Sequence, residues 1–229
     1  MLELKDYHVA YGESEVIKGL NLSLEKKEII AILGRNGMGK TTLMKSMIGM
    51  IPTKEGSMKL DGKELSGLKS HDRVAAGIGF VPQGRMIFST MTVEENIETG
   101  LTTTKNTKVP EDLYNIFPVL REMSKRRGGN LSGGQQQQLA IARALASNPE
   151  VLLLDEPTEG IQPSIIKEMA QTLKEIRDAR GLSIIVSEQV LSFALDIADR
   201  IIVIEKGKII HDEPRDAVDA EKVAAYLSV

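Results

Sequence analysis

The sequence predicts an α/β fold in which helices flank a central, mostly parallel β-sheet. Short apolar runs that are typical of buried strands alternate with segments of helical periodicity. A glycine-rich segment joins one of these runs, Ile29–Leu33, directly to a helical pattern. The first residues instead alternate between apolar and polar side chains, which indicates an N-terminal antiparallel β region.

The first quarter of the chain supplies mostly strands. We expect half-buried antiparallel strands over residues 2–10 and 20–24, and a buried strand over 29–33. Apolar residues after the glycine-rich segment recur at helical spacing and predict a helix over 40–49. Residues 57–60, followed by an Asp-Gly pair, predict a strand and a turn.

The remaining segments alternate between strand and helix. Residues 78–81 predict a buried strand, and residues 92–127 are helical in pattern but broken by Gly100, Pro110 and Pro118. A strong helix is expected over 132–146. Beyond it we expect strands over 151–154 and 183–186, a helix over about 164–179, and a hairpin that joins 201–204 to 208–210.

Composition limits the class of protein. A chain of 229 residues with 41% hydrophobic residues can form one large domain, or one domain with a helical insertion. The net charge of −3 gives no global attraction to nucleic acid, and the lack of cysteine excludes a disulfide framework. No apolar run is long enough to cross a bilayer and the first residues do not resemble a signal peptide, so we expect a cytoplasmic chain.

Residues 34–42 read Gly-Arg-Asn-Gly-Met-Gly-Lys-Thr-Thr and match the phosphate-binding pattern of a glycine, four free residues and Gly-Lys-[Ser/Thr]. Gly34, Gly37 and Gly39 let the backbone amides turn toward an anion at the positive end of the next helix. Lys40 would reach the β- and γ-phosphates, and Thr41 would offer its hydroxyl to Mg²⁺. The strand, lysine and hydroxyl in register disfavour an ordinary glycine-rich turn, so the sequence predicts binding of a nucleoside triphosphate.

Two carboxylates follow the apolar strand at 151–154. Asp155 would hold Mg²⁺, through water, and Glu156 would polarise the water that attacks the γ-phosphate. An acidic strand end without function is the alternative, which the phosphate loop upstream disfavours.

A second anion cap opens the helix at 132–146. Residues 131–135 read Leu-Ser-Gly-Gly-Gln, with a serine at the helix start and two glycines that allow close backbone approach. One nucleotide needs only one phosphate cradle. We therefore expect this cap to close over the nucleotide of another copy, with an ordinary helix cap as the alternative.

With these three motifs in this order, the chain resembles the ATP-binding subunit of ABC transporters over its full length. Tyr11 sits where that family stacks an aromatic ring on adenine, and Gln83 sits at the loop that contacts Mg²⁺ and faces the membrane subunit. Residues 131–135 match the family signature. The resemblance implies a single ATP-binding domain over 1–229, with a helical subdomain at approximately 84–148 inserted in a RecA-like core.

The resemblance also implies ATP and Mg²⁺ as cofactors and a set of site residues. The expected catalytic residues are Lys40, Glu156 and Gln189. The expected metal contacts are Thr41, Gln83 and Asp155. The expected nucleotide contacts are Tyr11, Gly34, Asn36, Gly37, Gly39, Lys40, Thr41, Thr42 and Gln83, with Ser132, Gly133, Gly134 and Gln135 supplied by a second copy.

Two positions depart from the common family pattern. Gln162 stands where many relatives have an aspartate. The usual switch histidine is absent, and its place falls on Gln189, whose amide could still donate to the γ-phosphate. Glu188 is the competing residue if this register is wrong by one.

Several segments resemble the branched-chain amino acid and urea branch of the family, among them residues 82–85, 155–166 and 225–227. Residues 126–129, 135–138 and 163–167 most resemble the urea-type subunit. The expected function is therefore ATP hydrolysis that powers import of a small polar solute, of the urea or branched-chain amino acid type, through separate membrane subunits.

The resemblance implies membrane permease subunits, a second ATP-binding subunit arranged head to tail, and an indirect periplasmic or extracellular solute-binding protein as partners, without nucleic acid. The chain is expected at the cytoplasmic face of the membrane. Candidates for the coupling surface are Arg85, Met86, Ile87 and Phe88, with a buried core segment as the alternative. Within transport, an exporter or an amide importer stays open. A ribosome-associated or DNA-maintenance ATPase is the alternative from another class. The single domain, the absence of a basic surplus and the short distance from Gln83 to Leu131 disfavour it.

Overall fold

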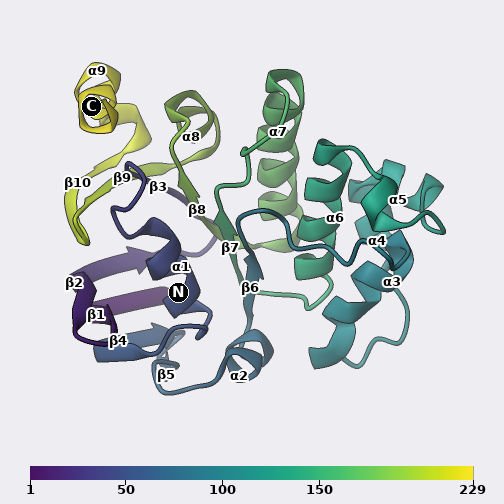
Figure 1. Cartoon of the computed structure of the whole chain (residues 1–229), viewed down its shortest axis with the longest axis horizontal. Helices are drawn as coiled ribbons and strands as arrows, with labels where there is room; N and C mark the ends of the chain where they lie inside the picture. The colour runs from purple at the N-terminus through teal and green to yellow at the C-terminus, as the bar shows by residue number, and fades with distance from the viewer. Residues whose placement is uncertain (229) are drawn as a thin grey trace.

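The computed structural model describes residues 1–228, which form a mixed α/β structure built on two sheets (Figure 1). Within these residues, the larger sheet has six strands in the order β10-β9-β3-β8-β7-β6. All neighbours pair parallel except β10, which forms an antiparallel hairpin with β9. The strands are β3 (Ile29–Leu33), β6 (Ile78–Val81), β7 (Val151–Asp155), β8 (Ser183–Glu188), β9 (Arg200–Glu205) and β10 (Lys208–Pro214). The expected mostly parallel sheet is confirmed.

Side chains of the central strands alternate between two hydrophobic clusters, one on each face of the sheet. In β3, Ile29, Ala31 and Leu33 belong to one cluster, and Ile30 and Ile32 belong to the other. Strands β7, β8 and β9 divide in the same way. A strand that is covered on both faces has a continuous apolar sequence, which explains why these strands could be recognised without a structure.

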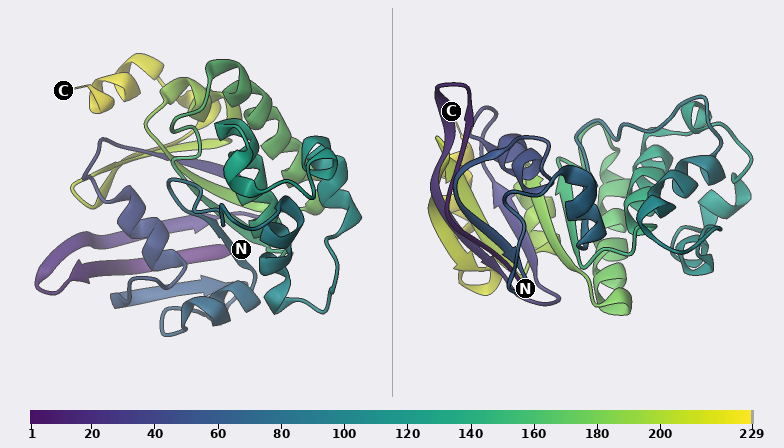
Figure 2. Two further views of the ribbon diagram at one scale, coloured as in Figure 1. Left: turned by 45° about the vertical axis from the view of Figure 1, so that its right-hand side comes forward. Right: turned by 90° about the horizontal axis from the view of Figure 1, so that it is seen from below.

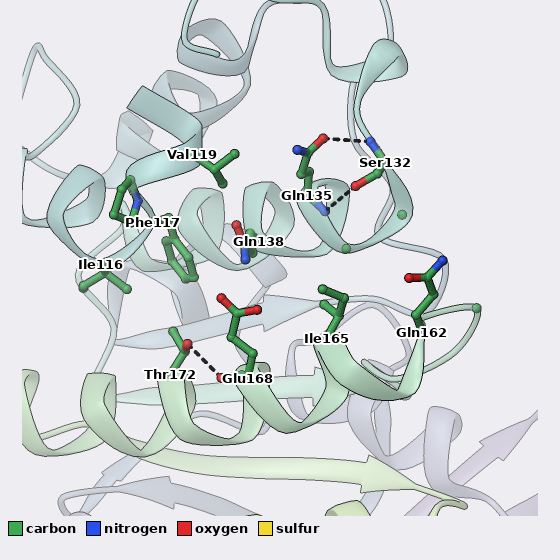
Figure 3. Close-up of a pocket in the computed structure, with 14 residues that line it drawn as sticks. Ile116, Phe117, Val119, Ser132, Gln135, Gln138, Gln162, Ile165, Glu168 and Thr172 are labelled. Carbon is green, nitrogen blue, oxygen red and sulfur yellow. Dashed lines mark hydrogen bonds between the residues drawn. The ribbon is translucent and has the colours of Figure 1, made fainter. Parts of the chain in front are cut away.

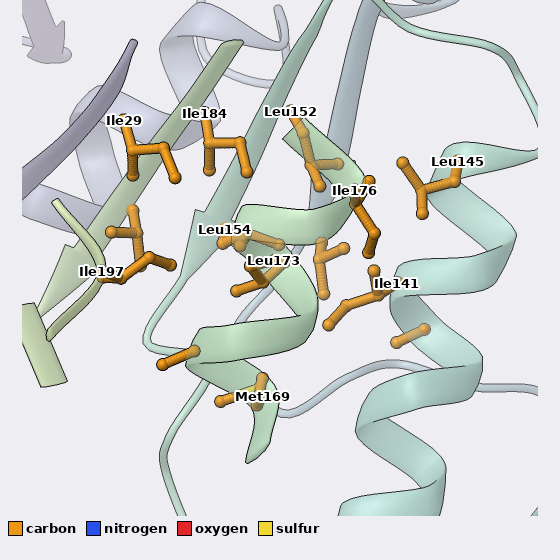
Figure 4. Close-up of a cluster of buried hydrophobic side chains, with 14 of the residues drawn as sticks. Ile29, Ile141, Leu145, Leu152, Leu154, Met169, Leu173, Ile176, Ile184 and Ile197 are labelled. Atoms are coloured by element: carbon orange, nitrogen blue, oxygen red, sulfur yellow. The ribbon is translucent and has the colours of Figure 1, made fainter. Parts of the chain in front are cut away.

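Helices cover one face of this sheet. They are α6 (Gly133–Leu145), α7 (Pro163–Arg180) and α8 (Leu191–Ile197). Figure 4 shows side chains of α6 and α7, including Ile141 and Leu173, gathered against Leu152 and Leu154 of β7. The other face is covered by α1 (Lys40–Met47) and by the second sheet.

The second sheet is antiparallel, as expected, in the order β2-β1-β4-β5. Its strands are β1 (Leu2–Tyr11), β2 (Ser14–Leu24), β4 (Thr53–Leu60) and β5 (Lys63–Glu64). Strands β2 and β4 begin earlier than the expected starts at residues 20 and 57. Register shifts along β1 interrupt the alternation of both partner strands, so their first halves do not show a two-residue period.

A group of short helices lies between β6 and β7, on the side of the molecule away from the antiparallel sheet (Figure 2). It comprises α3 (Val93–Glu98), a 3₁₀ turn (Thr99–Thr103), α4 (Glu111–Ile116), α5 (Pro118–Glu122) and a second 3₁₀ turn (Gly128–Asn130), and it leads into the longer α6. Pro118 begins α5, and Gly100 lies in the first 3₁₀ turn, where a Cβ atom would stand 2.0 Å from the carbonyl oxygen of Arg143. The breaks predicted at these residues are confirmed, whereas the subdomain bounds at 84 and 148 stay a prediction.

Three short helices were not predicted from the sequence: α2 (Ser70–Ala75), α8 and α9 (Ala220–Leu227). Each has eight residues or fewer, which is shorter than the window in which helical periodicity can be recognised. Helix α1 ends at Met47 rather than at the expected Gly49, which has a positive φ of 81°. Among the described residues, no helix is both long enough and apolar enough to cross a membrane.

Candidate functional site

The glycine-rich segment 34–39 connects β3 to α1 at the carboxyl end of the central sheet. Gly37 and Gly39 have φ values of 78° and 109°, which few other residues adopt. At Gly34 a Cβ atom would stand 2.6 Å from the carbonyl oxygen of Ile204, so the loop packs too closely on β9 for any side chain. These glycines therefore shape the loop in the way the motif predicts.

Lys40 folds back over this loop. Its Nζ donates to the carbonyl oxygens of Gly34 at 2.6 Å and Arg35 at 3.2 Å, and it forms an ion pair with Glu156 Oε1 at 3.2 Å. The side chain is buried. Because a buried ammonium needs partners, these three oxygens compensate its burial.

Asp155 ends β7 and is buried beside α1 and β8. Its Oδ1 accepts hydrogen bonds from Ser187 Oγ at 2.6 Å and Thr41 Oγ1 at 3.2 Å. Burial raises the pKa of this carboxyl group above its ordinary value, against the effect of the two hydroxyls. Its Oδ2 is buried without a hydrogen-bond partner.

That orphaned oxygen fits a divalent cation. A buried carboxylate oxygen, next to a threonine hydroxyl, is the hard donor set that Mg²⁺ prefers. The described residues contain no cluster of three or more His, Cys, Asp or Glu side chains that could hold a metal. A cation here would therefore need further ligands from a bound phosphate and from water.

The carboxylate of Glu156 is held by three donors. Oε1 accepts from Lys40 and from Gln189 Nε2 at 3.0 Å, and Oε2 accepts from Gln83 Nε2 at 3.1 Å. Glu156 has a φ of 48°, a left-handed conformation that is uncommon outside glycine. This backbone turn brings the carboxylate over the phosphate loop.

Gln189 and Glu188 point in different directions. Gln189 Nε2 donates to Asn36 Oδ1 in the phosphate loop at 2.8 Å, in addition to Glu156. Glu188 is buried, and its two oxygens accept backbone N–H groups of Thr158, Gln189 and Val190. The side chain that reaches the site is Gln189, and Glu188 is a loop-holding residue behind it.

Half of the predicted site residues line one cavity of about 420 Å³. They are Asn36, Gly37, Gly39, Lys40, Thr41, Thr42, Gln83 and Glu156. Gly34, Asp155 and Gln189 adjoin it through the hydrogen bonds above. Tyr11 does not line the cavity; it lies at the end of β1 with 52% of its surface exposed.

The second predicted anion cap lies elsewhere. Ser132 and Gln135 form a reciprocal capping box at the start of α6, in which each side chain accepts from the other's backbone N–H. With Gly133 and Gly134 they line a separate cavity of about 600 Å³ between α6 and α7, which Gln162 also lines (Figure 3). The structure therefore does not bring this cap to the phosphate loop of its own chain.

Three residues at the site were not predicted from the sequence: Ser187, Arg35 and Val16. Ser187 is the parallel partner of Asp155, and Arg35 and Val16 line the phosphate-loop cavity. The expected strands ended at residue 154, one residue before the end of β7, and at residue 186, two residues before the end of β8. They therefore did not include the Asp155–Ser187 pair, and only the strand register could have indicated Ser187.

The fold and site together define a class. A glycine-rich loop leads from a parallel strand into a helix, and the lysine of the loop is ion-paired to a carboxylate at the end of another strand of the same sheet. This is the architecture of a P-loop nucleoside triphosphatase.

Comparison with known proteins identifies the family. The model of the ABC transporter family matches residues 17–159, so the chain belongs to this family and is an ATPase that binds ATP. The chain is 38% identical to the high-affinity branched-chain amino acid transport ATP-binding protein BraG of Pseudomonas aeruginosa, over 99% of each chain. It is 32% identical to the lipopolysaccharide export system ATP-binding protein LptB of Haemophilus influenzae, over 93% of this chain and 91% of LptB.

A solved structure supports the same conclusion. The dimeric post-hydrolysis state of the ATP-binding cassette MJ0796, bound to ADP and Pi, superposes with a TM-score of 0.83 at 26% identity. The match covers 94% of this chain and 99% of that cassette. The expected ABC-type fold is thereby confirmed.

Proposed function

We propose that this chain powers the import of a small polar solute, of the urea or branched-chain amino acid type, through separate membrane subunits. The ion pair of Lys40 with Glu156 in the phosphate-loop cavity carries the ATPase part of the proposal. The name of the Pseudomonas relative supports a branched-chain amino acid, whereas residues 126–129, 135–138 and 163–167 favour urea. The match between this chain and that transport subunit covers 99% of each, which disfavours a ribosome-associated or DNA-maintenance role.

In this proposal the phosphate loop receives the triphosphate. The backbone of residues 34–42 surrounds the phosphates, and Lys40 exchanges its carbonyl partners for phosphate oxygens. Asp155, Thr41 and Gln83 would hold Mg²⁺, which neutralises phosphate charge when bound. Tyr11 would need to approach the base from the edge of the cavity.

Glu156 is proposed as the general base. In the described state both of its oxygens are occupied by donors. When Lys40 turns to the phosphates, Oε1 loses one of its two donors and can use that lone pair to accept a proton from the attacking water. Gln189 stays within reach of both Glu156 and the loop and would donate to the γ-phosphate.

A head-to-tail dimer completes the proposed site. Ser132 and Gly134 cap α6 in a cavity of their own, far enough from the phosphate loop of the same chain that the two share no lining residue. A second ATP-binding subunit, identical or different, would place its own loop against this cap. The MJ0796 cassette is itself a dimer, which supports this arrangement.

The proposed coupling surface follows Gln83. Met86 and Phe88 expose 61% and 48% of their surfaces, whereas Ile87 packs against the core. Both exposed side chains line a cavity of about 440 Å³ between α6 and the parallel sheet. A partly apolar hollow of this kind suits a segment of a permease subunit, which would hold the chain at the cytoplasmic face of the membrane.

Uptake by intact cells tests the transport proposal. A strain that lacks the gene is compared for uptake of labelled urea and labelled leucine, with wild-type protein or Lys40→Ala restored on a plasmid. We expect one solute to be lost and to be recovered only with the wild-type protein. Recovery of uptake by Lys40→Ala, or no loss of either solute, would contradict the proposal.

A further inference from the structure

The C-terminal helix α9 ends against the phosphate loop. Arg35, the second residue of that loop, donates from Nε to the carbonyl oxygen of Tyr226 at 3.1 Å, across 191 positions of sequence. This contact joins α9 to the nucleotide cavity. Residues 225–227 of α9 otherwise only resemble one branch of the family.

Helix α9 is anchored independently of Arg35. Val223 is fully buried in the cluster that covers one face of the central sheet, and Tyr226 and Leu227 pack against the same cluster. The ring of Tyr226 also lies 6.0 Å from the ring of His211 on β10. This packing holds the carbonyl of Tyr226 in place, so it can fix the position of the Arg35 side chain that donates to it.

The chemistry of this contact is specific. The last carbonyl groups of a helix lack partners within the helix and form the negative end of its dipole. In α9 the carbonyl of Ala224 accepts from the N–H of Ser228, and the carbonyl of Tyr226 accepts from the guanidinium of Arg35. A cation from the loop thus caps the helix, which favours the contact over a neutral hydrogen bond.

The same residue contacts the catalytic lysine. The carbonyl oxygen of Arg35 accepts from Lys40 Nζ at 3.2 Å and from the N–H of Met38 at 3.4 Å, and Arg35 lines the phosphate-loop cavity. We propose that Arg35 is a positioning residue through which α9 holds the first turn of the phosphate loop in the shape that receives a triphosphate. This inference rests on the proposed nucleotide site.

A double-mutant cycle measures the contact. MgATP is titrated calorimetrically into four proteins: the wild type, Arg35→Met, a chain that ends at Val223, and the combination of both changes. We expect each single change to weaken binding about three- to tenfold, equivalent to ~0.7–1.4 kcal/mol at ~1.4 kcal/mol per factor of ten. The combined variant should bind MgATP no more weakly than the weaker-binding single variant, because both changes remove the same contact.

Two further variants separate positioning from loss of stability. Arg215→Met is the matched control, since Arg215 Nε donates to the carbonyl of Leu195 in α8 at 2.9 Å, away from the phosphate loop. It should change the melting temperature without changing MgATP affinity. Arg35→Lys keeps a donor and should recover part of the affinity. Arg35→Met should raise the KM for ATP by a larger factor than it lowers kcat.

Three results would overturn the inference. Wild-type affinity in Arg35→Met would show that the contact does not shape the loop. Additive losses in the combined variant would show that Arg35 and α9 act separately. Weak binding in Arg35→Met with normal binding in the shortened chain would make Arg35 a direct phosphate ligand. If the wild type itself bound no ATP, the proposed site would fail, a result distinct from these three.

Discussion

The carboxylate of Glu156 accepts from an ammonium and from two amides, and these donors differ in what each can contribute to hydrolysis. Lys40 carries a charge, and in the proposed mechanism it moves to the phosphates. Gln83 and Gln189 carry no charge, so a phosphate attracts them less strongly and they can stay with Glu156. At the scale of single residues, the site is poised to exchange partners when a nucleotide arrives.

Gln189→Ala should slow hydrolysis while leaving ATP binding nearly intact. Its amide reaches Asn36 and Glu156, and a hydrogen bond to a charged group contributes about 1.5–3 kcal/mol. That corresponds to a loss of roughly ten- to a hundredfold in rate. Steady-state turnover and calorimetric titration measure the two quantities.

Glu188→Ala is the register control for this prediction. It removes the acceptor of three backbone N–H groups, so it should lower the melting temperature. A slow but stable Glu188→Ala, together with a normal Gln189→Ala, would assign the switch role to Glu188.

Glu188 also predicts a pH dependence of stability. Burial raises the pKa of its carboxyl group above its ordinary value of 4.5. A folded pKa above the unfolded one means that this contribution to stability is fully present below about 4.5 and is lost as the pH rises through the folded pKa. Denaturant unfolding of the wild type and Glu188→Gln at a series of pH values that rises from about 4.5 checks this. The wild type should lose stability relative to the variant as the pH rises; a constant difference would show that Glu188 does not titrate there.

At the scale of elements, α6 connects two surfaces. Its first residues form the Ser132–Gln135 capping box, and Arg143 near its other end donates to the carbonyls of Arg85 and Met86 at 3.0 and 2.8 Å. The same guanidinium lies over the ring of Phe88. A single helix therefore joins the proposed partner-facing cap to the proposed coupling surface.

Arg143→Met should loosen the segment that follows Gln83. Gly84, Arg85 and Met86 have φ values of 74°, 66° and 44°, and such conformations cost about 1 kcal/mol or more at each non-glycine residue. Without the guanidinium, we expect faster hydrogen exchange at residues 84–88, a stability loss of about 1–3 kcal/mol, and unchanged ATP affinity.

Arg121→Met is the matched control, because Arg121 also lies over an aromatic ring, that of Tyr114, but its side chain is half-exposed. Exchange at 84–88 should not change in this variant. Equal exchange in Arg143→Met and the wild type would show that the turn does not depend on Arg143.

At the scale of the whole molecule, the phosphate loop and the α6 cap open into different cavities. Glu156→Gln should bind ATP but hydrolyse it at least roughly a hundredfold more slowly, because the proposed general base is lost. If the cap closes on a partner's nucleotide, this variant should accumulate as a dimer with ATP in size-exclusion chromatography.

The combined variant Glu156→Gln/Ser132→Ala tests the geometry of that dimer and should dimerise less. Its stability must be measured as well, since loss of the helix cap costs about 1 kcal/mol. A monomeric Glu156→Gln at high ATP would count against closure between identical copies and would favour a different subunit as partner.

The sequence by itself determined the parallel strands, the phosphate loop and the acidic strand end. Ile29–Leu33 and residues 151–154 are apolar throughout because both faces of each strand are covered, so burial is visible in the strand itself. The loop could be predicted because its glycines, lysine and threonine are neighbours in the chain and serve one ligand.

The tertiary structure alone decided which side chains meet across the chain. Strand register places Ser187 beside Asp155, and the turn after β8 aims Gln189 rather than Glu188 at the loop. Helix α9 was too short to show periodicity, yet packing of Val223 brings its end to Arg35. Such contacts form between residues that are far apart in the chain. Local sequence patterns predict secondary structure, and they do not predict which distant residues come into contact.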